Sequence, residues 1–292
     1  MNSTLKLWTQ LGLGTALAGG MLAACGGEAG GEAGGEAGGE AAAVAGVAGG
    51  EGEGGAGGEG EAGAAPAPAP AGGEGEGGVA VADAATDPVA YGIALAVTEA
   101  HVVAARDAFA AGKKDSAAEM FAHPASEVLV EMDPVFAKLG VADFKPLLTD
   151  ASVAVTDGKP AAEVNKHYDA IIAALRGAAT KAPKGSASDA KVAAAIIADQ
   201  IERASAMYRL IAKDAAYEPY LDGYGFARVA ASAFVRNAKA IKAENPDLHA
   251  RISEALAVLG KAYPAAARPA KLAVEQGAVS AASSKVMLAA GS

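Results

Sequence analysis

The sequence predicts an all-α protein, a multi-helix bundle preceded by a disordered tether rich in Gly, Ala and Glu. Three observations support this class. Alanine dominates the second part of the chain while aromatic residues make up only 5% of the whole. Apolar residues recur there at helical spacing, as in Ile197, Ile201, Tyr208 and Ile211. Capping residues and prolines lie at the expected helix starts.

The helical pattern divides into successive segments separated by turn signals. Thr86-Asp87-Pro88, Ser188-Asp189 and Asn245-Pro246 each place a capping residue before a helix, and Asp133-Pro134 and Gly158-Lys159-Pro160 are interpreted in the same way. The predicted helices span 88–111, 115–122, 124–139, 143–156, 160–180, 188–216, 222–243, 246–262 and 268–290. A Pro/Gly/Ser break at 181–188 divides this domain, residues 89–292, into two halves of similar length. Alanine-rich helices pack closely, which favours a bundle.

Residues 25–88 are predicted to be a tether that begins at Cys25. The segment repeats Gly-Gly-Glu-Ala, then Glu-Gly, and passes through alternating Ala and Pro at 65–70. It has almost no apolar bulk to bury, and its glutamates repel one another, so disorder is expected. This segment also accounts for the net charge of -10, because residues 89–292 carry 23 Lys and Arg against 22 Asp and Glu. A near-neutral domain has no nucleic-acid footprint, so we expect no nucleic acid among its partners.

The first 24 residues have the composition of a secretory signal peptide. Lys6 supplies a positive charge, and 11–24 is a small, apolar stretch too short to span a bilayer comfortably. Cys25 is the only cysteine, so disulfides, zinc-type cysteine pairs and c-type haem attachment are excluded. A soluble secreted protein with one stray cysteine is the alternative reading of this terminus.

Leu22-Ala23-Ala24-Cys25 resembles the lipobox of bacterial lipoproteins. The resemblance implies that Cys25 becomes a diacylglyceryl-modified N-terminus and that the membrane is a partner through it. In a Gram-negative host, Gly26 after the cysteine resembles the pattern of lipoproteins sent to the outer membrane. The expected location is therefore the cell envelope, with a lipid-anchored domain facing the periplasm.

A candidate metal site lies around two histidines. His123 precedes Pro124, which is expected to start a helix from which Glu127 and Glu131 project one turn apart on one face. His101 lies on an apolar, inward face of the preceding helix. Imidazole and carboxylate together suit iron, copper or zinc, the cofactors considered. In the alternative reading, both histidines are structural.

A second candidate contact site is an aromatic cluster in a Pro/Gly-rich turn. It comprises Tyr217, Tyr220, Asp222, Tyr224 and Arg228. Aromatic side chains with polar tips receive ligands or partners, and they also seal the ends of bundles. Both roles are open from the sequence.

The export signal, the helical halves and a histidine preceded by Glu99 resemble the periplasmic iron-uptake proteins of the imelysin and ferrous-iron-transport type. The resemblance implies an exported helical bundle with a His/Glu metal site. The Gly-x-His-x-x-Glu motif of imelysin-like proteins is absent, since His101 has Glu99 two residues before it and Ala104 three residues after it.

These observations predict a lipid-anchored helical binding protein that handles a transition metal or haem iron. The alternative is a structural lipoprotein that scaffolds an envelope complex through a protein partner. The chain has no phosphate loop, nucleophile elbow or His-Glu-x-x-His motif, and we expect it not to be an enzyme.

Overall fold

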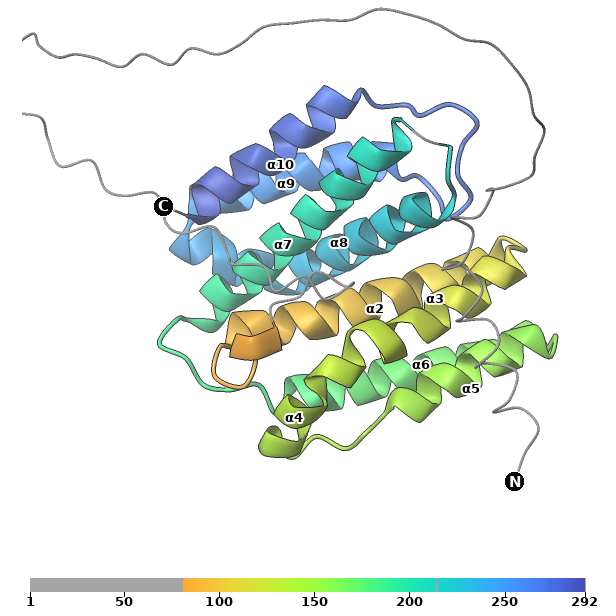
Figure 1. The fold of residues 1–292 in the computed structure, drawn as a ribbon. Coiled ribbons are helices and arrows are strands. Elements are labelled where there is room, and N and C mark those ends of the chain that lie inside the picture. The colour runs from red at the N-terminus through yellow and green to blue at the C-terminus, as the bar shows by residue number, and fades with distance from the viewer. Residues whose placement is uncertain (1–80, 214, 292) are drawn as a thin grey trace, which may run out of the picture. The chain divides into compact units, whose positions relative to one another are not determined.

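The computed structural model describes residues 81–213 and 215–291 (Figure 1). Within these ranges the chain forms nine α-helices and a short 3-10 helix and contains no strand, which confirms the all-α class. The signal peptide, Cys25 and nearly all of the predicted tether lie outside the described residues.

The helices follow the predicted order along the chain. The short helix η1 spans Val81–Asp83, and the α-helices span Pro88–Ala110 (α2), Lys114–Glu127 (α3), Leu129–Leu139 (α4), Lys145–Thr156 (α5), Ala161–Ala179 (α6), Asp189–Ile211 (α7), Glu218–Glu244 (α8), Pro246–Ala262 (α9) and Gln276–Ala290 (α10).

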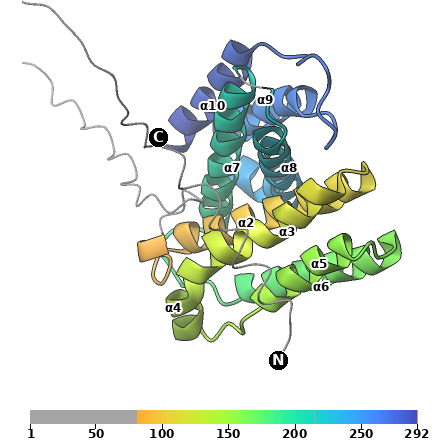
Figure 2. The same ribbon diagram turned by 45° about the vertical axis from the view of Figure 1, so that its right-hand side comes forward.

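The α-helices form two groups that meet along α2. Helices α2, α3, α5 and α6 pack in one group with the short α4 at its end, and α7 to α10 pack in the other (Figures 1 and 2). Helix α2 contacts both α7 and α8 of the second group. Elements far apart in sequence therefore meet at the α2/α8 contact, where the candidate site lies.

Helix α2 is the central element of the fold. Its length and composition alone would allow it to cross a membrane, but 78% of the relevant window is buried inside the bundle. Helices α3, α6, α7 and α8 cover it, so its apolar character is that of a core helix. Ala94, Ala104 and Ala108 are among its fully buried residues, and their small side chains let neighbouring helices approach closely.

Local capping explains several helix starts. The side chain of Asp87 accepts a hydrogen bond from the backbone N–H of Val89 at 2.7 Å, and Ser188 and Asn245 cap α7 and α9 in the same way. Asp133-Pro134 is an exception, because it lies inside α4 rather than at a helix start. The folded region also begins before residue 89, since Ala84 is fully buried and Val81 packs against the core.

Several predicted boundaries differ from the structure. Helix α7, expected to run to 216, ends at Ile211. Helix α3 continues through Pro124 and ends at Glu127, because Pro124 is itself buried and packing outweighs the lost backbone hydrogen bond. Helix α8 starts at Glu218, four residues early, with Pro219 in its first turn, where a missing N–H does no harm. Helix α10 starts at Gln276, and 263–275 form a loop without a regular helix.

Candidate metal site

His101 lies in the middle of α2 with only 8% of its surface exposed. Its Nδ1 lies 2.9 Å from the carbonyl oxygen of Val97. A carbonyl can only accept, so Nδ1 carries the proton and Nε2 presents a lone pair. Burial lowers the pKa of His101, and the ring is held edge-on to Phe226 at 5.9 Å. The structure thus presents an imidazole with a fixed orientation, whose Nε2 can act as an acceptor.

Asp222 on α8 faces that nitrogen. Its Oδ1 lies 3.5 Å from Nε2 of His101, and this buried oxygen has no hydrogen-bond partner among the described residues. Burial raises the pKa of Asp222 to about 7, with a further contribution from the charge of Glu218. When Asp222 is ionised, two acceptors face each other, and only a proton, a water or a cation between them satisfies both.

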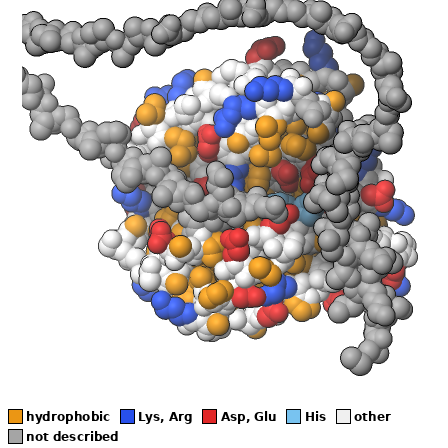
Figure 3. Space-filling model, in the orientation of Figure 1, with side chains coloured by type: hydrophobic (Ala, Val, Ile, Leu, Met, Phe, Trp, Pro, Cys, Tyr) orange, Lys and Arg blue, Asp and Glu red, His pale blue; other side chains and the backbone are white. Residues whose placement is uncertain are grey.

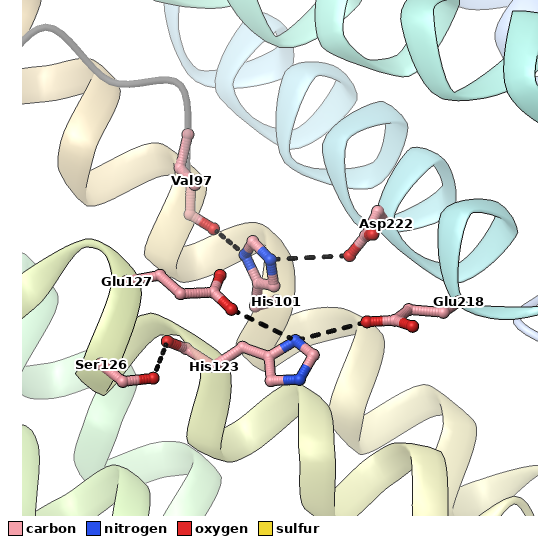
Figure 4. Close-up of polar contacts among 7 residues, drawn as sticks. All are labelled: Val97, His101, His123, Ser126, Glu127, Glu218 and Asp222. Atoms are coloured by element: carbon pink, nitrogen blue, oxygen red, sulfur yellow. Dashed lines mark hydrogen bonds and ion pairs between the residues drawn. The ribbon is translucent and has the colours of Figure 1, made fainter. Parts of the chain in front are cut away.

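His123 on α3 brings a second set of ligand-type groups. Its ring centroid lies 6.5 Å from that of His101. Its Nδ1 lies 4.0 Å from Oε1 of Glu127, one turn further along α3, and 3.8 Å from Oε1 of Glu218 at the start of α8 (Figure 4). The side chain of Glu218 is 61% exposed, so this part of the site opens to solvent.

Glu131 does not lie where the sequence analysis expects it. The chain breaks at Val128 between α3 and α4, so Glu127 and Glu131 do not share a helix. The prediction that they project from one helical face was wrong, because Pro124 does not end α3 and the break falls four residues later. Glu131 is exposed on α4, and it takes part in none of the contacts that join the two histidines to carboxylates.

Sequence reasoning missed Glu218 and assigned Asp222 to the aromatic cluster. The available signal was spacing, since Glu218 and Asp222 are four residues apart and share one face once α8 begins at Glu218. His123 and Glu127 have the same spacing on α3. These two pairs, on α3 and α8, form the candidate site together with His101.

The tyrosines of the aromatic cluster use their hydroxyls to hold the fold. Tyr217 donates to the carbonyl of Ala266 at 3.0 Å and Tyr220 to that of Ala265 at 2.7 Å. Both bonds fix the loop before α10. Tyr224 instead donates to Asp107 of α2 at 2.7 Å, and the Arg228 guanidinium lies 6.0 Å from the centre of the Tyr224 ring. These contacts are those of side chains that close the end of a helical bundle. Of the residues in the aromatic cluster, Asp222 is the one that faces His101.

The donor set is chemically suited to a transition metal. Two imidazoles and three carboxylates are the mixed nitrogen and oxygen ligands that iron, zinc and related ions accept. In a tetrahedral site with bonds of about 2.1 Å, neighbouring ligand atoms lie roughly 3.4 Å apart. The 3.5 Å between Nε2 of His101 and Oδ1 of Asp222 is close to this separation of neighbouring ligand atoms. Among the described residues no three such side chains gather around one point as they stand, so binding a cation requires side-chain rotation, mainly of the exposed Glu218 and the partly exposed Glu127.

Comparison with known families supplies one match in this part of the chain. Residues 215–289 match the family described as iron permease-associated 4-helix bundle domain. The matched segment covers α8, α9 and α10, and it includes Glu218 and Asp222. It is less than half of the chain. Neither a curated protein nor a solved structure matches. The C-terminal helices are therefore similar to a helical domain associated with iron permeases.

Proposed function

We propose that this protein is a lipid-anchored, cell-envelope protein whose helical domain binds a transition-metal ion, iron in the first place. The observation that carries the proposal is the pair of acceptors inside the bundle, Nε2 of His101 and Oδ1 of Asp222, 3.5 Å apart. His123, Glu127 and Glu218 extend this pair into a five-residue ligand set.

The energetics support a binding role for the pair. A buried carboxylate oxygen without a donor destabilises a fold, typically by about 1–3 kcal/mol. The surrounding tyrosines all find backbone or side-chain partners, whereas Oδ1 of Asp222 finds none. A cation between the two acceptors would satisfy both. The proposed cargo is a free ion rather than haem, because three carboxylates are unlike the axial ligands that haem iron takes.

The similarity of 215–289 to an iron permease-associated domain supports both the metal and the location. It favours iron over copper and zinc, and it favours association with the cell envelope. The lipobox-like segment ending at Cys25 supports a lipid anchor, outer-membrane in a Gram-negative host, with the domain held in the periplasm on the tether. We propose a binding role and not catalysis.

The charges on one face of the domain bear on the kind of partner that is proposed. On the face seen in Figure 3, Lys and Arg are interspersed with Asp and Glu, without one large basic field. A nucleic-acid partner would call for such a field.

Metal binding by the purified mature protein tests the proposal. Calorimetry with Fe²⁺ under anaerobic conditions, and with redox-inert Zn²⁺, is expected to show binding at micromolar protein concentration. The double substitution His101→Ala with His123→Ala is expected to abolish it while the circular dichroism stays helical.

His249→Ala is the matched control, because this histidine lies on α9 with its ring against Phe234, 5.0 Å between centroids. It is expected to leave metal binding unchanged. If the unaltered protein binds neither ion, the metal proposal fails and the scaffolding lipoprotein becomes the better description.

A further inference from the structure

We propose that the site holds two divalent cations side by side, one at His101 and Asp222 and the other at His123, Glu127 and Glu218. This inference rests on the proposed function and adds the number of ions and the ligands of each.

The two histidine nitrogens are turned to different carboxylates. Nε2 of His101 faces Asp222, while Nδ1 of His123 faces Glu127 and Glu218 (Figure 4). The 3.5 Å within the first group is close to the roughly 3.4 Å between neighbouring ligands around one ion, whereas the 3.8 and 4.0 Å within the second group must shorten by side-chain rotation. The groups therefore point to two centres.

The separation of the groups suits a two-metal site. The imidazole centroids lie 6.5 Å apart with 65° between the ring planes. Paired metal ions in proteins lie about 3.5–4 Å apart, which leaves room for one ion beside each ring. His101 cannot swing to share an ion with His123, because its Nδ1 is bonded to Val97 and its ring is packed against Phe226.

Glu218 connects the two centres. It shares α8 with Asp222 of the first centre, one turn away, and yet its Oε1 faces His123 of the second. A carboxylate in this position can place one oxygen on each ion. Its exposure also opens the second centre to solvent, whereas His101 of the first centre is buried. Ions would then enter through the His123 side.

Charge favours two ions over one. The two imidazoles are neutral ligands, and three ionised carboxylates sum to a charge of -3. One divalent cation leaves the partly buried cluster negative, whereas two leave a small positive charge that a bridging hydroxide neutralises.

Metal stoichiometry of the full mature protein tests the inference. Equilibrium dialysis against Zn²⁺ and against Mn²⁺ is expected to give two ions per chain, and the two Mn²⁺ ions are expected to show a spin-coupled electron paramagnetic resonance spectrum. Asp222→Asn is expected to reduce the count from two to one and to remove the coupling. Glu119→Gln alters an exposed acid elsewhere on α3 and is expected to keep two.

The possible results separate the inference from the proposed function. One ion per unaltered chain, lost in the double histidine variant, overturns the two-ion site and leaves metal binding intact. No ion overturns both. Two ions in Asp222→Asn would show that the assignment of ligands to the first centre is wrong. Binding of a single trivalent ion such as Ga³⁺, with no second Zn²⁺ or Mn²⁺ taken up, also counts against two centres.

Discussion

At the scale of single residues, Asp222 is an acid whose burial opposes its ionisation. Its side chain is largely buried on α8, its Oδ1 has no donor, and burial raises its pKa from 3.8 to about 7. His101 opposite it is kept neutral by burial and cannot supply a proton through Nε2 while Nδ1 is bonded to Val97. Such a pair is what a binding site requires and what a purely structural core avoids.

Asp222→Asn is therefore expected to stabilise the metal-free protein at pH 8. The pKa is raised in the folded state, so the stability associated with Asp222 is complete below pH 3.8 and is lost as the pH rises through about 7. One pKa unit corresponds to about 1.4 kcal/mol, which gives an upper bound of roughly 4 kcal/mol for the gain at pH 8. The gain should shrink steadily toward pH 4. Urea unfolding in the presence of a chelator at several pH values measures it.

Asp150→Asn is the control for this measurement, because Asp150 is exposed on α5. It is expected to leave the free energy of unfolding nearly unchanged at every pH. A loss of stability in Asp222→Asn at pH 8 would contradict the view that this carboxylate lacks a donor in the metal-free protein.

At the scale of secondary-structure elements, the close approach of α2 and α8 builds the site. A Cβ atom on Gly225 would lie 2.3 Å from the carbonyl oxygen of Ala100, which precedes His101. Only glycine allows this approach, and it brings Asp222, three residues before Gly225, opposite the imidazole. The glycine that looks like a turn residue in the sequence is thus a packing residue inside a helix.

Gly225→Ala is expected to push α2 and α8 apart. The clash is with backbone, which cannot rotate away, so a loss of about 1–3 kcal/mol in unfolding free energy is expected. Metal affinity should fall roughly tenfold or more, since His101 and Asp222 are displaced relative to each other. Thermal unfolding and metal titration measure the two effects.

Gly260→Ala is the matched substitution, because a Cβ on this helical glycine of α9 meets nothing within 4 Å. It is expected to leave metal affinity unchanged and to stabilise the protein by about 0.5–1 kcal/mol. Equal effects of the two substitutions would show that the α2/α8 contact does not position the site.

At the scale of the whole molecule, the proposed anchor would determine where the proposed metal site works. Two acyl chains on one cysteine hold a protein at a membrane surface. A tether of about 63 Gly-rich residues would span roughly 45 Å root-mean-square, and more when charge and proline extend it. The predicted arrangement lets a membrane-held domain sample the space above the lipid surface.

Cys25→Ser is expected to abolish lipidation, because Cys25 is the only cysteine in the chain. Detergent partitioning should move the protein from the detergent phase to the aqueous phase, and intact mass should show no acyl groups. Gly26→Asp is the companion variant, expected to keep the lipid and, in a Gram-negative host, to move the protein to the inner membrane. An acylated, membrane-bound Cys25→Ser protein would refute the anchor.

The sequence by itself determined the helical class and the order of the helices. Apolar spacing, proline at the first turn and capping by Asp87, Ser188 and Asn245 act within a few residues, and so they can be detected along the chain. Boundaries that depend on tertiary contacts were predicted less well. Helix α3 passes through Pro124, which is buried, and the loop before α10 is held by hydrogen bonds from the hydroxyls of Tyr217 and Tyr220.

Only the tertiary structure decided which carboxylates face the histidines. His101 and His123 could be selected as candidate ligands from the sequence because the domain has few side chains that bind metals. Glu127 could be selected because it lies one helical turn after His123. Glu218 and Asp222 are far along the chain from both histidines, and no local pattern connects them. They meet because α2 and α8 pack at a glycine contact, and such a non-local pairing depends on the shapes of two helical faces rather than on the periodicity of either.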